Sequence, residues 1–158
     1  MKNRILLLAF VLCLTALSLV SAPLDAALIS SFETALPGET ATFDVSLLNS
    51  GTNPEFLTGI NFTLAGPPVV DDTRFFTLVP PMLAPGGSYV GPLFDVFVPA
   101  ATPFGIYTGV IDIVGGATVS SQDLLARMEF GVQVVPEPAT LFLIAPALAA
   151  LALVRLRH

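Results

Sequence analysis

The chain is poor in the residues on which most enzymes and metal sites depend. Its 158 residues include one cysteine, Cys13, one histidine, His158, and no tryptophan. Both Cys13 and His158 lie in the terminal segments, so the middle of the chain has no residue for Ser-His-Asp or Cys-His catalysis. Histidine-based zinc sites and disulfides are excluded from the middle for the same reason.

Positive charge is also scarce in the middle of the chain. Residues 28–135 contain ten acidic residues and two basic ones, Arg74 and Arg127, a net charge of −8. Nucleic acid requires a basic surface, so this balance argues against nucleic-acid binding. No Gly-rich phosphate loop precedes a helix, and no segment has a helical period over helical length. These absences favour an acidic, extracellular, all-β module.

The N-terminal segment has the organisation of an export signal. Lys2 and Arg4 precede an apolar run over residues 5–20, which is the pattern of a secretory signal peptide. Three alanines offer cleavage sites: Ala22, Ala26 and Ala27. Cleavage after the first would leave a proline at the new N-terminus, which favours the other two without choosing between them. We predict a signal peptide over residues 1–26, handled by the export machinery and signal peptidase; an uncleaved signal anchor is the alternative.

The C-terminal segment, residues 135–158, contains a proline motif, an apolar run and a basic end, in that order. The motif consists of Val135, Pro136, Glu137 and Pro138. Each proline fixes its own φ and restricts the preceding residue, so the motif predicts an extended, exposed strap. Residues 139–156 as a helix would cover about 27 Å, close to the roughly 30 Å hydrocarbon thickness of a bilayer. Arg155 and Arg157 should stay cytoplasmic, which places the domain outside.

This ordered triple at the extreme C-terminus resembles the PEP-CTERM sorting signal of Gram-negative bacteria. The resemblance implies that the tail holds an exported protein in the inner membrane until an exosortase cleaves near the motif at 135–138. Release or attachment at the cell surface would follow. It also implies a role near exopolysaccharide or biofilm matrix, and the lack of catalytic residues in the middle of the chain predicts that this role is non-enzymatic. The alternative is a permanently membrane-anchored adhesion or scaffold module.

The middle, residues 27–134, alternates short apolar-polar strands with Gly/Pro turns. The strands that we predict are Leu28–Glu33, Thr40–Leu48, Leu57–Leu64, Arg74–Val79, Ser88–Val98, Ile106–Val114 and Leu125–Val134. Gly91-Pro92 within one of them indicates a bulge or a sheet edge. About seven strands of this length indicate a two-sheet sandwich, flanked by a signal helix and a transmembrane helix.

Two similar segments each precede an alternating strand: Leu-Pro-Gly-Glu-Thr at residues 36–40 and Ala-Pro-Gly-Gly-Ser at residues 84–88. The pair resembles the equivalent strand starts of bacterial immunoglobulin-like adhesion modules. Residues 98–107 resemble the penultimate hairpin of such modules. The resemblance implies an immunoglobulin-like sandwich and no particular activity.

Few residues in the middle are candidates for ligand binding. Asp71 and Asp72 with Thr73 offer oxygen ligands for calcium, but without the spacing of a regular site, so a solvated acidic turn is favoured. Tyr89 is a candidate sugar platform, whereas Tyr107 is expected in the core. We therefore predict no catalytic residue, metal or cofactor. A small carbohydrate-binding or hydrolase domain with a spatially paired set of carboxylates is the remaining alternative.

Overall fold

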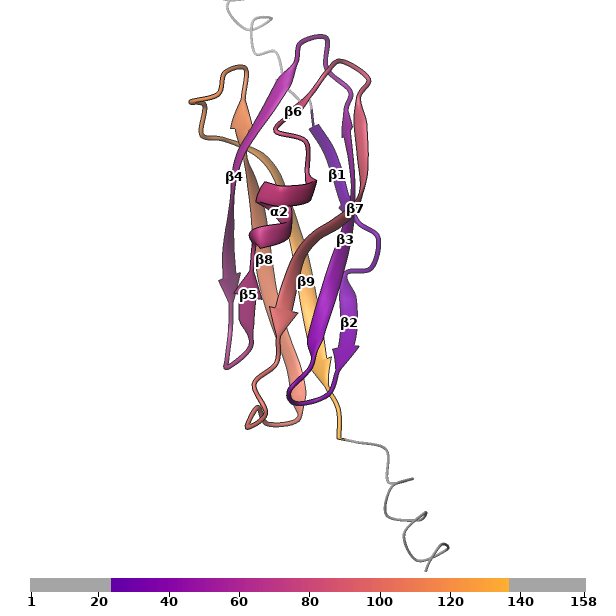
Figure 1. Ribbon diagram of the computed structural model, residues 1–158, viewed down its shortest axis with the longest axis vertical. Coiled ribbons are helices and arrows are strands. Elements are labelled where there is room, and N and C mark those ends of the chain that lie inside the picture. Colours follow the sequence, from indigo (N-terminus) through magenta and orange to yellow (C-terminus); the bar gives the residue numbers. More distant parts are fainter. Residues whose placement is uncertain (1–23, 137–158) are drawn as a thin grey trace, which may run out of the picture.

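The structure, a computed structural model, describes residues 24–136, which form two β-sheets packed face to face (Figure 1). The strands are β1 (Leu24–Leu28), β2 (Phe32–Ala35), β3 (Thr40–Asn49), β4 (Glu55–Leu64), β5 (Val69–Asp71), β6 (Met82–Leu83), β7 (Ser88–Phe97), β8 (Gly105–Gly116) and β9 (Asp123–Val134), and a short helix, α2, covers Thr73–Leu78. The four-stranded sheet has the order β1-β3-β7-β5, and the five-stranded sheet has the order β2-β9-β8-β4-β6. Neighbouring strands are antiparallel except β2 and β9, which are parallel. The predicted all-β sandwich is therefore confirmed for this part of the chain.

The predicted signal helix and transmembrane helix lie outside the described residues. Within residues 24–136, no helix has the length and apolar character needed to cross a bilayer.

The core lies between the sheets and follows the alternation that the sequence predicts. Phe43, Phe94 and Phe130 are almost fully buried and come from β3, β7 and β9. The rings of Phe43 and Phe94 stack at 4.8 Å, and the ring of Phe130 meets that of Phe94 edge-on at 4.9 Å. Because β9 belongs to the other sheet, this aromatic cluster joins the two layers. Each ring of this kind contributes roughly 1.5–3 kcal/mol through burial alone.

The five long strands, β3, β4, β7, β8 and β9, correspond to predicted strands and extend some of them by one to three residues. The predicted irregularity at Gly91-Pro92 is a bulge. Phe43 pairs with Phe94, whereas the next residue, Asp44, pairs with Pro92, which leaves one extra residue on β7.

The predicted strand Arg74–Val79 is wrong, because this segment is mostly the helix α2. Phe75 and Val79 are both buried, and they are four residues apart, which is a helical spacing. The Asp71 carboxylate accepts hydrogen bonds from the backbone N–H and the hydroxyl of Thr73, and this turn starts the helix. Over six residues, alternate apolar positions could not distinguish a strand from a single helical face.

The predicted first strand, Leu28–Glu33, is also wrong as a single element. β1 ends at Leu28 on the four-stranded sheet, and β2 begins at Phe32 on the five-stranded sheet, so the chain changes layers between them. The Ser30 hydroxyl donates to the Phe32 carbonyl at 2.7 Å, which stabilises the bend. A change of sheet leaves no period in the sequence, so the pattern gave no sign of it.

The two proline-glycine segments form equivalent turns. Glu39 N–H donates to the Leu36 carbonyl at 3.0 Å, and Gly87 N–H donates to the Ala84 carbonyl at 2.7 Å. Gly38 and Gly86 occupy the third position of these turns with φ of 90° and 71°, which favours glycine. The turn before β3 is hydrogen-bonded to the end of β7, because Gly38 N–H donates to the Val98 carbonyl. In the same way, the turn before β7 is hydrogen-bonded to the end of β3, because Gly86 N–H donates to the Asn49 carbonyl. The central pair of strands, β3 and β7, is thus closed in the same way at both ends.

The two ends of the described chain lie at opposite ends of the sandwich. β1 begins at the upper end in Figure 1, and β9 finishes at the lower end. The helix α2 packs against β7 on the face turned toward the reader.

Candidate functional site

The end of β9 positions the first half of the predicted sorting motif. Val134 pairs with Ala35 of β2, and the half-buried Val135 still donates its N–H to the Ala35 carbonyl at 3.2 Å. Pro136 is exposed and has no N–H, so it cannot extend the parallel ladder. The motif therefore begins at the residue where the sandwich ends. Glu137, Pro138, Arg155 and Arg157 lie outside the described residues.

The start of β1 bears on the predicted signal cleavage. Leu24 is 4% exposed and pairs with Asn49, and Ala26 pairs with Leu47. Cleavage after Ala26 or Ala27 would remove most of β1 and expose the edge of β3, whereas cleavage after Ala22 would keep β1 whole.

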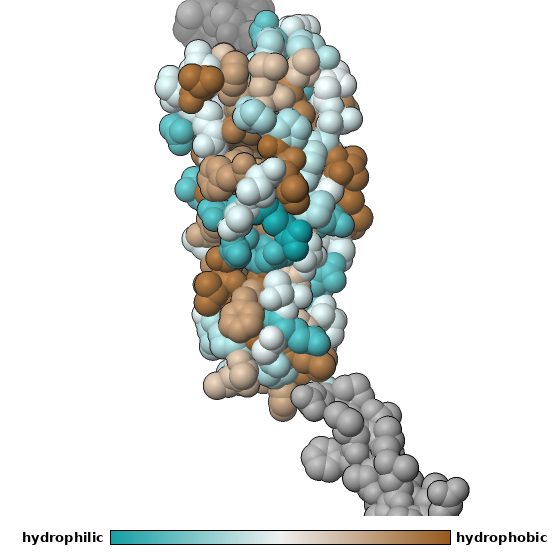
Figure 2. Space-filling model, in the orientation of Figure 1, coloured by the Kyte–Doolittle hydropathy of each residue, from teal (hydrophilic) through white to brown (hydrophobic). Residues whose placement is uncertain are grey.

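The outer face of the four-stranded sheet carries a row of polar side chains. Thr42, Asp95 and Asp71 are opposite one another on β3, β7 and β5. The Thr42 hydroxyl donates to one Asp95 carboxylate oxygen at 2.6 Å, and Arg74 of α2 donates its Nε–H to the other at 2.6 Å. In Figure 2 the most hydrophilic residues of this face gather across the middle of the sandwich. The row holds the helix on the sheet.

The carboxylate of the acidic turn before α2 is hydrogen-bonded within the protein. Hydrogen bonds from Thr73 hold the pKa of the Asp71 carboxyl below its ordinary value. In the region covering residues 24–136, no group of three or more His, Cys, Asp or Glu side chains is placed to hold a metal ion. Asp71 and Asp95 are opposite in register, yet each already has hydrogen-bond donors, so the pair lacks the free geometry of an acid and a base.

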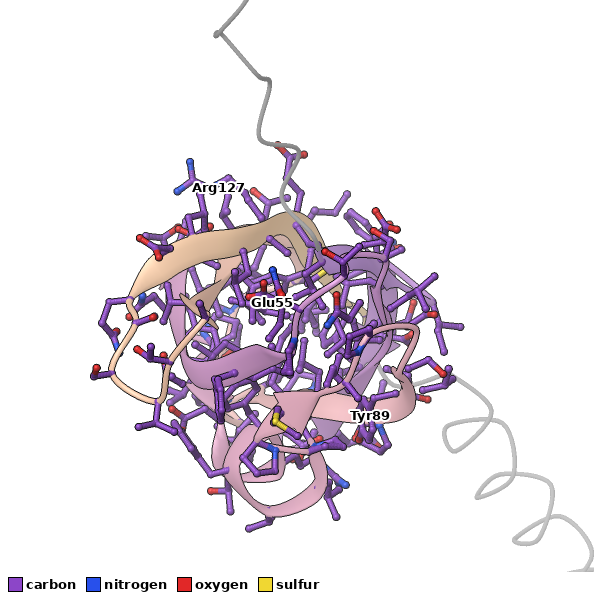
Figure 3. All side chains as sticks on the ribbon, turned by 90° about the horizontal axis from the view of Figure 1, so that it is seen from above. Glu55, Tyr89 and Arg127 are labelled. Carbon is purple, nitrogen blue, oxygen red and sulfur yellow. The ribbon has the colours of Figure 1, made fainter. Side chains whose placement is uncertain are left out.

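The two tyrosines do not form a binding platform together. Tyr89 lies on β7 and Tyr107 on β8, which belong to different sheets. Both are partly buried against the core, and each hydroxyl donates to a backbone carbonyl, of Pro92 and Pro103 respectively, at 2.8 Å. Figure 3 shows Tyr89 at the periphery of the sandwich, viewed along its length. Their positions favour structural roles.

A buried polar cluster near the start of β4 was missed from the sequence. Asn49 is fully buried, and its side-chain amide donates to the carbonyls of Asn53 and Leu83 at 2.8 and 2.9 Å. Its side-chain oxygen accepts the Gly51 N–H at 2.9 Å. Glu55 is 7% exposed, and its Oε2 has no hydrogen-bond partner among the described residues. The sequence indicated only a turn here, because an Asn-Ser-Gly turn looks the same whether its asparagine is buried or solvated.

An open groove of about 630 Å³ runs over the five-stranded sheet. Phe32 of β2 forms one wall and lies over Gly131, where an added Cβ would come within 2.6 Å of the ring. Glu129 is the one ionisable residue among those lining the groove within the described part of the chain. A single carboxylate without a partner base provides no acid-base pair, so the groove shows no catalytic arrangement.

An ion pair on the outer face of the five-stranded sheet gives a pH-dependent prediction. Arg127 donates two hydrogen bonds to the Asp112 carboxylate, at 2.7 and 2.6 Å, and they hold the pKa of Asp112 below its ordinary value near 3.8. Figure 3 shows Arg127 pointing away from the sandwich, and 62% of its side chain is exposed. Solvent therefore screens most of the attraction between the two charges, and the pair contributes little to stability.

We expect Asp112→Asn to lower the free energy of unfolding slightly at neutral pH. Because the carboxyl has a lower pKa in the folded chain than in the unfolded chain, its contribution is present above pH 4 or so and is lost as pH falls through the folded pKa. The difference between variant and wild type, measured by urea unfolding, should therefore shrink toward zero at the acid end. A difference that stays constant with pH would contradict this account.

Comparison with known proteins identifies the fold but no family. No protein-family model matches the chain, and no curated protein matches it. The chain is similar in structure to native alpha-2-macroglobulin from Escherichia coli, solved from domain MG7 to the C-terminus, with a TM-score of 0.51 and 20% identity over 75% of this chain. Only 17% of that protein is covered. The likeness therefore shows a shared β-sandwich fold and nothing about activity.

Weaker structural matches have TM-scores below one half. The secreted serine protease VesC from Vibrio cholerae matches with a TM-score of 0.48 and 13% identity, over 75% of this chain and 24% of that one. Domains 4 and 5 of the S-layer protein SbsC match with a TM-score of 0.42 and 20% identity, over 70% of this chain and 44% of that one.

Proposed function

We propose that the protein is an exported cell-envelope protein whose immunoglobulin-like sandwich is non-enzymatic and whose C-terminus is a PEP-CTERM sorting signal. An exosortase would cleave near residues 135–138 and free the sandwich from the inner membrane. The sandwich would then act outside the cell, near exopolysaccharide or biofilm matrix.

The observation that carries this proposal is the place where the sandwich ends. Within residues 24–136 every strand is complete by Val134, and Pro136 cannot join the sheet. Cleavage after Pro136 would therefore cost the sandwich no strand and no core residue. A sorting signal requires this separation between the part that is removed and the part that is kept.

The arrangement of polar groups supports a non-enzymatic role. The carboxylates of Asp71 and Asp95, which are opposite in register on β5 and β7, are bound by Thr42, Thr73 and Arg74. Glu129 is the one ionisable residue that lines the groove within the described part of the chain, and the buried Glu55 lies on a different strand, β4. A surface module with these features would bind a ligand or link two partners, and would not convert a substrate.

Replacing Pro136, Glu137 and Pro138 with alanines should leave export intact and stop processing. The three alanines remove the constraint that keeps the strap extended, while every strand of the sandwich remains. Mass spectrometry of the protein from the native Gram-negative host would then find the C-terminal residues, including Arg157, still attached. The matched control is Pro67→Ala, an exposed proline in the loop between β4 and β5, which should be processed as wild type.

Two outcomes would refute the sorting proposal. One is an unchanged mature mass after the triple substitution. The other is an intact Arg157-His158 end on the wild-type protein in an exosortase-containing host, which would favour a permanently anchored adhesion or scaffold module.

A further inference from the structure

The end of the sandwich from which the C-terminus leaves exposes large apolar side chains. We define the exit end as the loops at residues 36–39, 65–68 and 98–104 together with the finish of β9. Phe104 in the last of these loops and Ile106 at the adjoining start of β8 are each 62% exposed. Gly105, between them, pairs with Val134, the last residue of β9, so both side chains lie beside the point where the chain departs. Figure 1 shows these loops at the lower end of the sandwich.

A second exposed apolar pair lies near the exit end on the neighbouring sheet. Val69 and Phe97 pair across β5 and β7, and they are 56% and 44% exposed. Burying exposed surface of this kind is favourable, so these side chains would gain from an apolar partner.

The exit end is almost without charge, although the domain is strongly acidic. Glu39 is the one ionisable residue in the three loops, and its carboxylate accepts the Leu36 N–H at 3.0 Å; the strap that follows β9 adds one more acidic residue, Glu137. The other acidic residues of the sandwich lie outside these loops. An anionic lipid surface would repel the rest of the domain, but it meets little negative charge at this end.

The sequence that follows the sandwich limits how far this end can be from a bilayer. Residues 136–140 alone separate Val135 from the apolar run that begins at Leu141. Even fully extended, that link spans only about 20 Å. The polar headgroup layer is itself roughly 5–8 Å thick on each side of the hydrocarbon. A chain anchored through residues 141–154 therefore keeps its exit end at or near the headgroups.

From these observations we propose that, before cleavage, the exit end docks on the lipid bilayer and inserts Phe104 and Ile106 into the headgroup layer. This inference rests on the proposed membrane tail. Phenylalanine and aliphatic side chains favour burial at this depth. The docked sandwich would stand upright, with β1 pointing away from the membrane and the strap at Pro136 held close to the lipid surface.

The test uses the chain with its export signal removed and its C-terminal tail intact, reconstituted in phosphatidylcholine–phosphatidylglycerol vesicles. Ala101→Cys places an environment-sensitive fluorophore at the exit end, and Ala117→Cys places the same probe at the opposite end, both at exposed positions. With the signal removed, the chain has no other cysteine to label. Lipids with a quencher at a shallow acyl position report contact with each probe.

We expect strong quenching of the probe at position 101 and little at position 117. The double variant Phe104→Ser/Ile106→Thr should reduce quenching at position 101 by several fold, because it removes the apolar side chains whose burial in the bilayer would hold this end at the membrane. The matched control, Val119→Ser, alters a 75% exposed side chain at the opposite end and should leave the quenching unchanged.

The outcomes separate this inference from the proposed function. If the protein does not float with the vesicles, the membrane tail itself is wrong. If it floats but the 101 probe is quenched equally in wild type and double variant, tethering alone explains the proximity and docking is refuted.

Discussion

Replacing Phe94 with alanine is expected to lower the free energy of unfolding by about 3–5 kcal/mol. Phe94 is fully buried, stacks on Phe43 at 4.8 Å and meets Phe130 edge-on at 4.9 Å. Alanine would leave a cavity between rings that come from both sheets, so the layers could not close around it without moving strands. Since a domain of this size has a total stability of about 5–15 kcal/mol, the variant would be near its folding threshold. Urea unfolding followed by circular dichroism measures the change.

The matched control is Phe76→Ala, the same substitution on an exposed side of α2. Phe76 is 62% exposed and touches Phe75 at its edge. We expect a loss below about 1 kcal/mol. Equal losses for the two variants would show that the sandwich does not depend on the interlayer aromatic cluster.

Replacing Asn49 with alanine should cost about 2–4 kcal/mol, although the residue lies at the end of a strand. Its side chain makes three hydrogen bonds, and the one to the Leu83 carbonyl is fully buried. These bonds fix the turn after β3 to the strand β6, so the variant leaves a buried carbonyl without a donor. The same unfolding measurement tests it.

Asn49→Asp separates the roles of the amide. Aspartate keeps an acceptor for the Gly51 N–H but has no donor for the Leu83 carbonyl, so we expect it to be at least as unstable at neutral pH as Asn49→Ala. Asn61→Ala, on the exposed face of β4, is the control and should change stability by about 0.5 kcal/mol or less. A loss that small for Asn49→Ala would refute the role of this residue.

The long strands of the sandwich could be predicted because each buries one face. Apolar and polar residues that alternate over eight or more positions, as at Ala41, Phe43 and Val45, predict a strand and not a helix. Proline with glycine then marks the turns between strands. The helix at Thr73–Leu78 was missed because the two buried residues of the predicted strand, Phe75 and Val79, are four residues apart, which fits either structure. The change of sheet between β1 and β2 was missed because it depends on the distant strands with which each segment pairs, and not on the local conformational preference of the residues.

The candidate site was predictable to a different extent. The order of proline motif, apolar run and basic end is readable without a structure, since each part has its own composition. The coincidence of the end of β9 with the start of the motif could not be predicted. It depends on the pairing of Val134 with Ala35, two residues that are far apart in the sequence. The apolar exit end was likewise hidden, because Phe104 and Ile106 look in sequence like residues of the core.

The parallel pairing of β2 with β9 has a mechanical consequence. β9 is bonded along both edges, to β2 and to β8, and it leaves the sandwich along its own axis. A pull on the C-terminal tail would therefore load both ladders in shear, with many hydrogen bonds resisting at once rather than opening one after another. A protein tugged at this point, whether by a moving cell or by flowing water, would hold its shape under tension.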